Sequence, residues 1–561
     1  MIENLNVVEQ VFDIINTAIE ASWELLEITK NRADNEFQSI SNMLSEMIEK
    51  TIPLTCELGK EAPGLKTDIA LQSCVASLKR IRGMYEDRFS KALMKIEFEL
   101  IPILEEARIN LYYWGVVAGD EDKEKQYYES DMHHLSGNRY TEEAIKSGEF
   151  KYDLSIFVLA YNKSNYTKMC LASLFENLPQ NLTYELILVN NGSSDDTESI
   201  FNNINPHKQI DIEINGAGMN MISRIFEGRY LLSISNDVLV QERSIENLYE
   251  CISSADDIGV AVPATPNVSN FQAPKDAIYD DLEGLRKYAN EKNNAEKDWE
   301  QRSRLVDPIS IVDAKVFHVL NWGHYYTSDN WLSFPDDRMS LILRRNNYKM
   351  MLVNNAFCHH FGSITIKDDQ STNSSQAYKE GRKVFWEKFG IDPWEKCCYS
   401  YALNYMMKYD RLDSVNILDI EAGLGGNALR FKYEFQQKNP ACQVNIVCTE
   451  SRDVYMKDLQ KIADERYVCK KLSELPFCNN GYDYVIFEVP MKQGEDFNIA
   501  ANTLMGYLHE KGTLIMQIYE NVLETIKKNH NLENVNFVCD ENKNFFWIMI
   551  NKSKIRSVLC E

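Results

Sequence analysis

The chain has 561 residues, of which 44% are hydrophobic and 26% charged, and its formal net charge is −24 at pH 7. This length corresponds to roughly three domains of ~150 residues each. The negative charge argues against a nucleic-acid partner or an anionic membrane surface. No apolar run reaches the ~18 residues of a transmembrane helix. The acidic start, MIENLNVVEQVFD, is not typical of a signal peptide.

The 13 cysteines are scattered and odd in number, and none has a spacing typical of zinc ligands. Buried thiols in a reducing compartment explain this usage best. We therefore expect a cytoplasmic protein without a membrane span.

Residues 1–115 are predicted to form a helical arm or bundle, because apolar residues recur three and four apart in VVEQVFDIINTAIEASWELLEIT. Helix breaks are expected at 31–35, at Pro53 and at the EAPG of 61–64. Two interpretations stay open: a surface for a protein partner or for oligomerisation, and a purely structural bundle. Residues 116–150 are predicted to be a charged linker with a short helix.

The segment 151–237 contains three apolar runs, LSIFVLA, YELILVN and YLLSIS, each of which ends abruptly in polar residues. Such runs are typical of buried parallel strands. A helical pattern at 164–177 separates the first two, so the unit is a right-handed strand–helix–strand crossover. Ligands bind at the carboxyl ends of such strands, which are 161–162, 190–193 and 235–237. We expect this domain to span 151–390, with a polar insertion at 267–306.

Residues 391–561 are predicted to form a second α/β domain. SVNILDIEAGLGGNALRFKYEF has the pattern of a strand, a glycine-rich turn and a helix, and CQVNIVCTES and YDYVIFEVP add further strands. The predicted fold class is therefore α/β, with a helical amino-terminal arm and two doubly wound domains.

Five motifs in the middle domain follow one another in a telling order: AYN at 160–162, VNNGSSDD at 189–196, SND at 235–237, PDDRMSL at 335–341 and CHHFGS at 358–363. Together they resemble the family 2 glycosyltransferases of the GT-A fold, over about 151–365. The resemblance implies a nucleotide-sugar site made of Ala160, Tyr161, Asn162, Asn190, Asn191, Gly192, Ser193, Asn236 and Trp331. An amide side chain suits the donor and acceptor positions of a uracil edge.

The same resemblance implies a divalent metal, Mn²⁺ or Mg²⁺, that stabilises the diphosphate leaving group. Asp237 is the first choice of ligand, although Ser235 stands where the family has another acid. His359 or His360 is expected to be a further ligand, and the other is expected to be structural. Asp336, or alternatively Asp337, is implied as the general base for an inverting reaction. Both carboxylates also suit a helix N-terminus.

The carboxyl-terminal sequence ILDIEAGLGG resembles the first motif of S-adenosylmethionine-dependent methyltransferases. It departs from that motif at the first glycine, which is Glu421, while Gly423 and Gly425 remain and Glu450 lies where the ribose-binding acid is expected. A carboxylate at 421 crowds and repels the carboxylate of the cofactor. We therefore expect a degenerate site that does not bind S-adenosylmethionine.

The order of helical arm, family 2 domain and methyltransferase-like tail resembles the flagellin-modifying glycosyltransferases of low-GC (clostridial-type) bacteria. That resemblance implies transfer of N-acetylglucosamine from a UDP-sugar to Ser or Thr of flagellin. Three alternatives stay open: an enzyme acting on a lipid-linked or polysaccharide precursor, a bifunctional enzyme that also methylates, and a non-catalytic scaffold.

Overall fold

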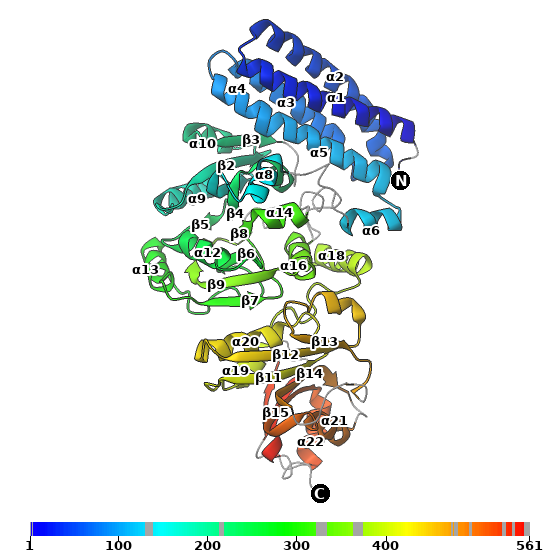
Figure 1. Cartoon of the computed structure of the whole chain (residues 1–561), viewed down its shortest axis with the longest axis vertical. Helices are drawn as coiled ribbons and strands as arrows, with labels where there is room; N and C mark the ends of the chain where they lie inside the picture. Colours follow the sequence, from blue (N-terminus) through cyan, green and yellow to red (C-terminus); the bar gives the residue numbers. More distant parts are fainter. Residues whose placement is uncertain are drawn as a thin grey trace. The chain divides into compact units, whose positions relative to one another are not determined.

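The structure is a computed structural model, and it describes residues 2, 4–129, 138–212, 218–320, 334–362, 374–472, 475, 481–492, 496–529, 535–540 and 545–554. The chain divides into two compact units (Figure 1). The first comprises Met1–Lys297, Asp307–Arg338 and Val353–Gly381, and the second comprises Asp298–Val306, Met339–Leu352 and Arg382–Glu561. The predicted boundaries at 115, 150 and 390 stay predictions.

The first unit begins with a helical region in which long helices pack side by side (Figure 1). Its elements are α1 (Leu5–Lys30), α2 (Asp34–Glu61), α3 (Thr67–Met84), α4 (Phe89–Lys95), the π-helical turn η1 (Ile96–Leu100), α5 (Ile101–Tyr112), a second π-helical turn η2 (Tyr113–Val117), α6 (Glu121–Glu129) and α8 (Arg139–Ser147). The Asn4 side chain caps α1 by accepting from the Val7 N–H. Apolar residues such as Val11, Leu25 and Leu44 are buried between the helices.

The break expected at Pro53 does not occur, because α2 continues through it to Glu61. An interior proline costs about 3 kcal/mol through a lost hydrogen bond and a steric clash. The buried face of α2, which includes Phe37, Leu44 and Ile48, offsets that cost by packing against α1 and α3. The breaks near 31–33 and after Glu61 occur where the sequence predicts them.

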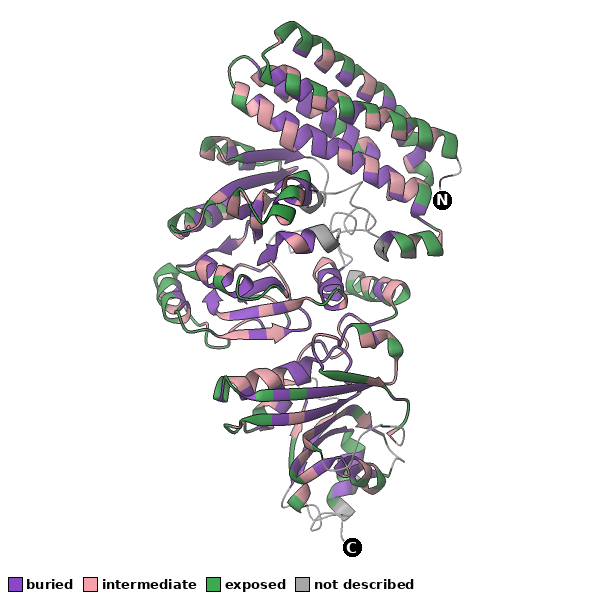
Figure 2. Cartoon of the chain, in the orientation of Figure 1, coloured by how far each residue is buried: buried purple, intermediate pink, exposed green. Residues whose placement is uncertain are grey.

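One sheet has eight strands in the order β3-β2-β1-β4-β8-β6-β9-β7, with β7 (Trp299–Arg302) at its edge. Its other strands are β1 (Tyr152–Ala160), β2 (Tyr184–Asn191), β3 (Lys208–Ile212), β4 (Gly228–Ser235), β6 (Ile258–Ala264), β8 (Ile309–Asp313) and β9 (Lys349–Phe357). β1 pairs in parallel with both β2 and β4, as predicted, and β8 joins β4 antiparallel. The central strands are almost wholly buried (Figure 2).

Helices connect these strands and bring the carboxyl ends of β1, β2 and β4 to one edge of the sheet. They are α9 (Ser164–Glu176), α10 (Thr197–Ile204), α11 (Gly218–Ile225), α12 (Ser244–Ile252), α14 (Ala314–Leu320) and α16 (Pro335–Arg345). The polar insertion contains the helix α13 (Leu282–Lys292). A separate two-stranded antiparallel sheet joins β5 (Val238–Leu239), which follows β4 in sequence, to β10 (His359–His360).

The second unit is a sheet in the order β13-β12-β11-β14-β15-β17-β16, parallel from β13 to β15 and antiparallel beyond. The strands of this sheet are β11 (Ser414–Ile420), β12 (Gln443–Glu450), β13 (Glu465–Val468), β14 (Tyr482–Met491), β15 (Leu508–Ile518), β16 (Val535–Cys539) and β17 (Phe546–Asn551). The second unit includes the part of α18 (Ser374–Phe389) that begins at Arg382. Its other helices include α19 (Tyr401–Met406), α20 (Gly426–Lys438), α21 (Phe497–Met505) and α22 (Glu520–Asn529). Two short 3₁₀ segments are η3 (Asp453–Lys457) and η5 (Lys552–Lys554). The predicted α/β class with two doubly wound sheets is confirmed.

A short stretch from the middle of the sequence belongs to this second unit. Arg344 Nε lies 2.9 Å from Asp458 Oδ1, and Arg345 Nε lies 3.1 Å from Asp458 Oδ2. Asp458 is fully buried, and these two guanidinium groups compensate the charge of its carboxylate. Nothing in the sequence pattern predicts this pairing.

Candidate active site

Hydrogen bonds join the carboxyl ends of β1, β2 and β4 into one loop cluster. The Asn162 N–H donates to Ser193 Oγ (2.8 Å), and the Ser194 N–H donates to Asn162 Oδ1 (2.8 Å). Asn236 Nδ2 in turn donates to the Asn162 carbonyl (3.2 Å). The three strand ends that the sequence marked as polar therefore form a single edge, which is where open α/β sheets bind ligands.

The backbone turns sharply at this edge. Asn162 and Gly192 both have positive φ, 55° and 79°, a region that asparagine and glycine tolerate better than other residues. The Ala160 side chain is fully buried in β1, whereas the Tyr161 side chain is 41% exposed. An accessible aromatic ring beside a loop edge offers a stacking face for a planar base.

The two asparagines at the end of β2 are buried at about 5% exposure each. Asn190 Oδ1 accepts from the Ser193 N–H (3.0 Å), and Asn190 Nδ2 donates to Asp211 Oδ1 (3.2 Å). An amide has two N–H donors and two acceptor positions, so a donor and an acceptor of Asn190 remain beyond these contacts. Asn191 Oδ1 is buried and has no hydrogen-bond partner among the described residues.

The pairing of β5 with β10 brings one histidine to Asp237. His360 Nε2 lies 3.3 Å from Asp237 Oδ2, and the Phe361 N–H donates to the Asp237 carbonyl (3.1 Å). His359 faces elsewhere: its Nδ1 lies 2.6 Å from the Tyr279 hydroxyl, and its ring packs edge-on against Phe361. Burial, and next the neighbouring His360, lower the pKa of His359. Successive strand residues point to opposite faces, which explains why only one of the pair reaches Asp237.

Asp237 and His360 fit a divalent ion held by one carboxylate and one imidazole. Among the described residues no group of three or more His, Cys, Asp or Glu side chains is arranged to hold a metal. Asp237 and His360 would each supply one ligand, and the oxygens of a bound diphosphate would supply others. An ion there would neutralise charge on the diphosphate leaving group.

Asp336 lies in the first turn of α16 and forms a hydrogen bond with the Asp307 side chain. Asp307 Oδ2 also accepts from Ser310 Oγ (3.4 Å), and the next residue, Pro308, accepts a hydrogen bond from the Ser235 N–H (2.8 Å). Burial, and next the Asp336 carboxylate, raise the pKa of Asp307 well above its usual range. The Asp307 and Asp336 side chains therefore interact directly beside the end of β4.

Sequence reasoning missed Asp307, because a lone acid before Pro308 carries no pattern that separates it from a loop residue. Asp337, the alternative base, is 3% exposed and so is buried within its unit. Trp331, which was expected near the sugar, lies outside the described residues.

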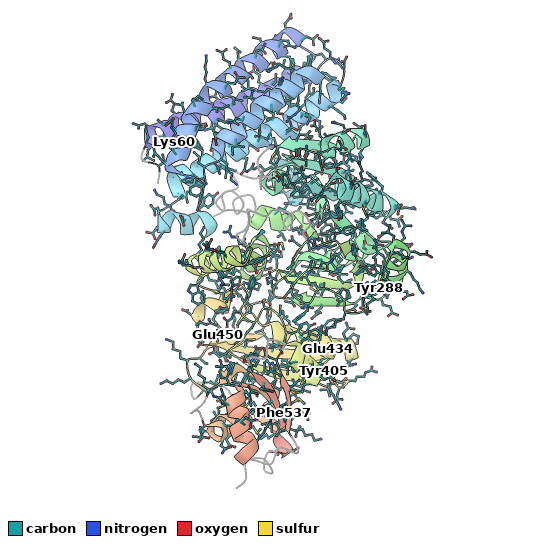
Figure 3. The ribbon with its side chains drawn as sticks, turned by 180° about the vertical axis from the view of Figure 1, so that it is seen from behind. Lys60, Tyr288, Tyr405, Glu434, Glu450 and Phe537 are labelled. Atoms are coloured by element: carbon teal, nitrogen blue, oxygen red, sulfur yellow. The ribbon has the colours of Figure 1, made fainter. Side chains whose placement is uncertain are left out.

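In the second unit, residues of the glycine-rich motif form hydrogen bonds with other residues of the same chain. Glu450 Oε2 accepts from the Gly423 N–H (3.1 Å) and Glu450 Oε1 accepts from Arg452 Nε (3.1 Å). Figure 3 labels Glu450 in this unit, at the end of β12. The acid expected to bind a ribose therefore already has two donors from its own chain.

Glu421 takes a left-handed backbone conformation (φ 59°) and accepts a hydrogen bond from Ser451 Oγ (3.0 Å). Burial, and next the Glu450 carboxylate, raise the pKa of Glu421 to about 7. Gly425 has φ 71°, and a Cβ there would approach Ile462 Cγ2 to 2.7 Å, so glycine is required at that position. A cavity of about 460 Å³ beside these residues is lined by Glu395, Lys396, Glu421, Ser451, Arg452, Glu488 and four further residues.

Residues 155–317 match the model of the family described as glycosyl transferase family 2. This match lies within the segment from which a glycosyltransferase was expected, and it supports that expectation. No curated protein matches the chain. Among the described residues, no helix is both long and apolar enough to cross a membrane.

Several solved structures are similar to parts of the chain. GalNAc-T7, determined with UDP, GalNAc and Mn²⁺, is 11% identical over 44% of this chain and 51% of its own, with a TM-score of 0.32. TarS residues 1–349 from S. aureus are 14% identical over 42% of this chain and 65% of their own, with a TM-score of 0.30. A Listeria monocytogenes protein described as a class I S-adenosylmethionine-dependent methyltransferase is 15% identical over 34% of this chain and 71% of its own, with a TM-score of 0.23. The chain thus spans about half the length of the first of these structures.

Proposed function

We propose that this protein is an inverting, metal-dependent glycosyltransferase that uses a UDP-sugar. The observation that supports this most is the shared edge of the first sheet. There the loops that follow β1, β2 and β4 are hydrogen-bonded to one another. Asp237 lies beside His360. Asp307 interacts with Asp336, and its neighbour Pro308 accepts a hydrogen bond from the Ser235 N–H. A site for a nucleotide, a diphosphate and a nucleophile needs these three kinds of group close together.

In this proposal Asn190, Asn191 and Tyr161 hold the base, while Asp237 and His360 hold the ion that binds the diphosphate. Asp336 takes the proton from the acceptor hydroxyl. The hydroxyl oxygen then bonds to the anomeric carbon as the bond from that carbon to the diphosphate oxygen breaks, and UDP leaves with the electron pair. One displacement inverts the configuration at the sugar carbon.

We further propose that the sugar is N-acetylglucosamine and that the acceptor is a Ser or Thr hydroxyl of flagellin. The order of the three regions along the chain supports this acceptor, with helices before the transferase domain and a methyltransferase-like domain after it. Glu450 already accepts hydrogen bonds from Gly423 and Arg452, and Glu421 places a carboxylate where the motif has its first glycine. Both observations favour a carboxyl-terminal domain that does not bind S-adenosylmethionine.

The test is turnover of a panel of nucleotide sugars, with purified flagellin as acceptor, with Mn²⁺ or with EDTA. We expect one UDP-sugar to be consumed, with loss of activity in EDTA and in Asp237→Ala. Turnover of a UDP-sugar with a lipid-linked or polysaccharide acceptor, and none with flagellin, would overturn the acceptor. Absence of turnover and of nucleotide binding across the panel would overturn the enzyme itself.

A further inference from the structure

A buried cluster of charges lies where the helical region meets β3 in the first unit. Lys95 Nζ is 2.5 Å from Glu99 Oε2 and 2.9 Å from Asp211 Oδ2. Arg80 Nη2 is 3.0 Å from Glu99 Oε1 and donates to the Asp211 carbonyl at 3.0 Å. The exposed fractions of Lys95, Glu99 and Asp211 are 2%, 0% and 7%. Two cations and two carboxylates therefore balance one another; Lys95, Glu99 and Asp211 are buried, and the Arg80 side chain is 27% exposed.

The surroundings of Glu99 and Lys95 favour the charged form of each. Burial opposes the charge on Glu99, but the attraction of Lys95 and then of Arg80 outweighs it, so the pKa of Glu99 is below its usual value. Burial likewise opposes the charge on Lys95, yet Glu99 and Asp211 raise its pKa. Buried charges of this kind are costly to break singly, because the partner left behind is uncompensated.

The Asp211 side chain connects the cluster to Asn190, which lies at the end of β2. Asn190 and Asp211 are direct neighbours in the pairing of β2 with β3. Asp211 Oδ1 accepts from Asn190 Nδ2 (3.2 Å), while Asp211 Oδ2 accepts from Lys95 and from Gln209 Nε2 (3.2 Å). A carboxylate only accepts hydrogen bonds, so the nitrogen of the Asn190 amide must face Asp211.

That constraint orients the rest of the amide. With its nitrogen toward Asp211, the Asn190 oxygen accepts from the Ser193 N–H at 3.0 Å and holds the turn at Gly192. The second N–H and the second lone pair of the amide then have fixed directions. If the amide could rotate by 180°, its donor and acceptor atoms would exchange positions. The side chain would then no longer distinguish one base edge from another.

We propose that Asp211 and Lys95 are positioning residues of the nucleotide site, and that the helical region is therefore a working part of that site as well as a scaffold. This inference rests on the proposed function, since it assigns Asn190 to the nucleotide. It also gives the helical region a role that neither of the sequence interpretations included.

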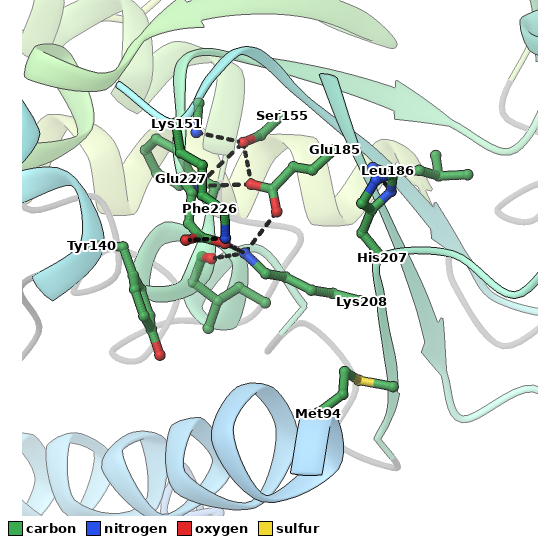
Figure 4. Close-up of polar contacts among 12 residues, drawn as sticks. Met94, Tyr140, Lys151, Ser155, Glu185, Leu186, His207, Lys208, Phe226 and Glu227 are labelled. Atoms are coloured by element: carbon green, nitrogen blue, oxygen red, sulfur yellow. Dashed lines mark hydrogen bonds and ion pairs between the residues drawn. The ribbon is translucent and has the colours of Figure 1, made fainter. Parts of the chain in front are cut away.

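The chain offers a matched control at the opposite end of the same strand. Lys208, at the start of β3, is 2.7 Å from Glu185 Oε2 and 2.8 Å from Glu227 Oε2, and its side chain is 3% exposed (Figure 4). It also donates to the Ile225 carbonyl at 2.6 Å. Lys208 thus resembles Lys95 in burial and in holding two carboxylates, but it lies at the amino end of the sheet, away from the strand-end loops.

The experiment measures UDP binding in Mn²⁺ by calorimetry, and the KM and kcat for the UDP-sugar, in full-length Asp211→Asn, Lys95→Met, Lys95→Arg and Lys208→Met. The isosteric Asp211→Asn has a single acceptor oxygen, so either Asn190 or Lys95 loses its partner. We expect Asp211→Asn and Lys95→Met to weaken UDP binding and raise KM about tenfold or more, with kcat within about threefold. Lys95→Arg, which keeps the charge, should restore most of the affinity.

Lys208→Met should lower the unfolding midpoint as much as Lys95→Met while leaving UDP affinity unchanged. Equal loss of UDP affinity in Lys208→Met would overturn the inference, because the effect would then be general destabilisation. Unchanged affinity in Asp211→Asn and Lys95→Met would also overturn it. If the wild-type protein binds no UDP at all, the proposed function fails first, which is a different result from normal binding in the variants.

Discussion

Replacing Asp336 with asparagine is the sharpest test of the proposed chemistry. Asparagine is nearly isosteric with aspartate, and its amide can still form a hydrogen bond with the Asp307 side chain. The start of α16 should therefore keep its structure. What the variant loses is the ability to take a proton from the acceptor hydroxyl.

The expected loss follows from that one function. General base catalysis contributes about 10²–10⁴-fold to rate, which is roughly 3–5 kcal/mol of transition-state stabilisation at ~1.4 kcal/mol per factor of ten. Asp336 interacts with Asp307, whereas the loop residues that we propose hold the nucleotide are hydrogen-bonded to one another. We therefore expect a fall in kcat of this size with unchanged affinity for UDP.

The assay is transfer to the acceptor at saturating UDP-sugar, with UDP affinity measured in parallel. Asp337→Asn is the matched control, since it changes the adjacent acid, which is 3% exposed. A kcat for Asp336→Asn within about threefold of wild type would refute the assignment. A large loss confined to Asp337→Asn, with an unchanged unfolding midpoint, would transfer the role to that residue.

Three further predictions concern the metal, the second unit and its pH response. Asp237→Asn should reduce transfer about 10²-fold or more at 1 mM Mn²⁺, with partial recovery at higher Mn²⁺, because one of two protein ligands is weakened; activity that is insensitive to both the substitution and EDTA would contradict it. Asp458→Ala should destabilise the second unit by about 3–5 kcal/mol in urea unfolding, since it leaves the buried Arg344 without its carboxylate; a change below about 1 kcal/mol would show that the pair adds little. Burial, and next Glu450, raise the pKa of Glu421 to about 7, above its unfolded value of about 4.3, so its contribution to stability is present at low pH and is lost between those values as pH rises. Glu421→Gln should therefore become more stable relative to wild type as pH increases from about 4.5 to 7, and a thermal-unfolding difference that does not vary with pH would contradict the linkage.

The sequence alone was enough for the fold class and for the sheet edge that carries the candidate site. Short apolar runs that end in polar residues are a local pattern in the sequence. A parallel strand covered by helices on both faces of its sheet has this pattern, because its side chains are buried on both faces. The same reasoning located the ends of β1, β2 and β4, because parallel strands present their carboxyl ends together. It was wrong about Pro53, because the packing of α2 against its neighbours outweighs a local penalty that the pattern does show.

Only the tertiary structure decided which side chains meet. The sequence left His359 and His360 open, and the pairing of β10 with β5 turned His360 toward Asp237 and His359 toward Tyr279. Asp307 and Asp336 are 29 residues apart in sequence, and their shared hydrogen bond depends on how α16 approaches the start of β8.

The buried contact between Lys95 and Asp211 spans 116 residues. A residue's own neighbours in sequence determine whether it lies in a helix or a strand. Its partner across a packed interior is determined by segments far away in the chain, and no local pattern records them. For that reason the sequence predicted the edge of the sheet that carries the site, and the fold determined which charges and amides are held there.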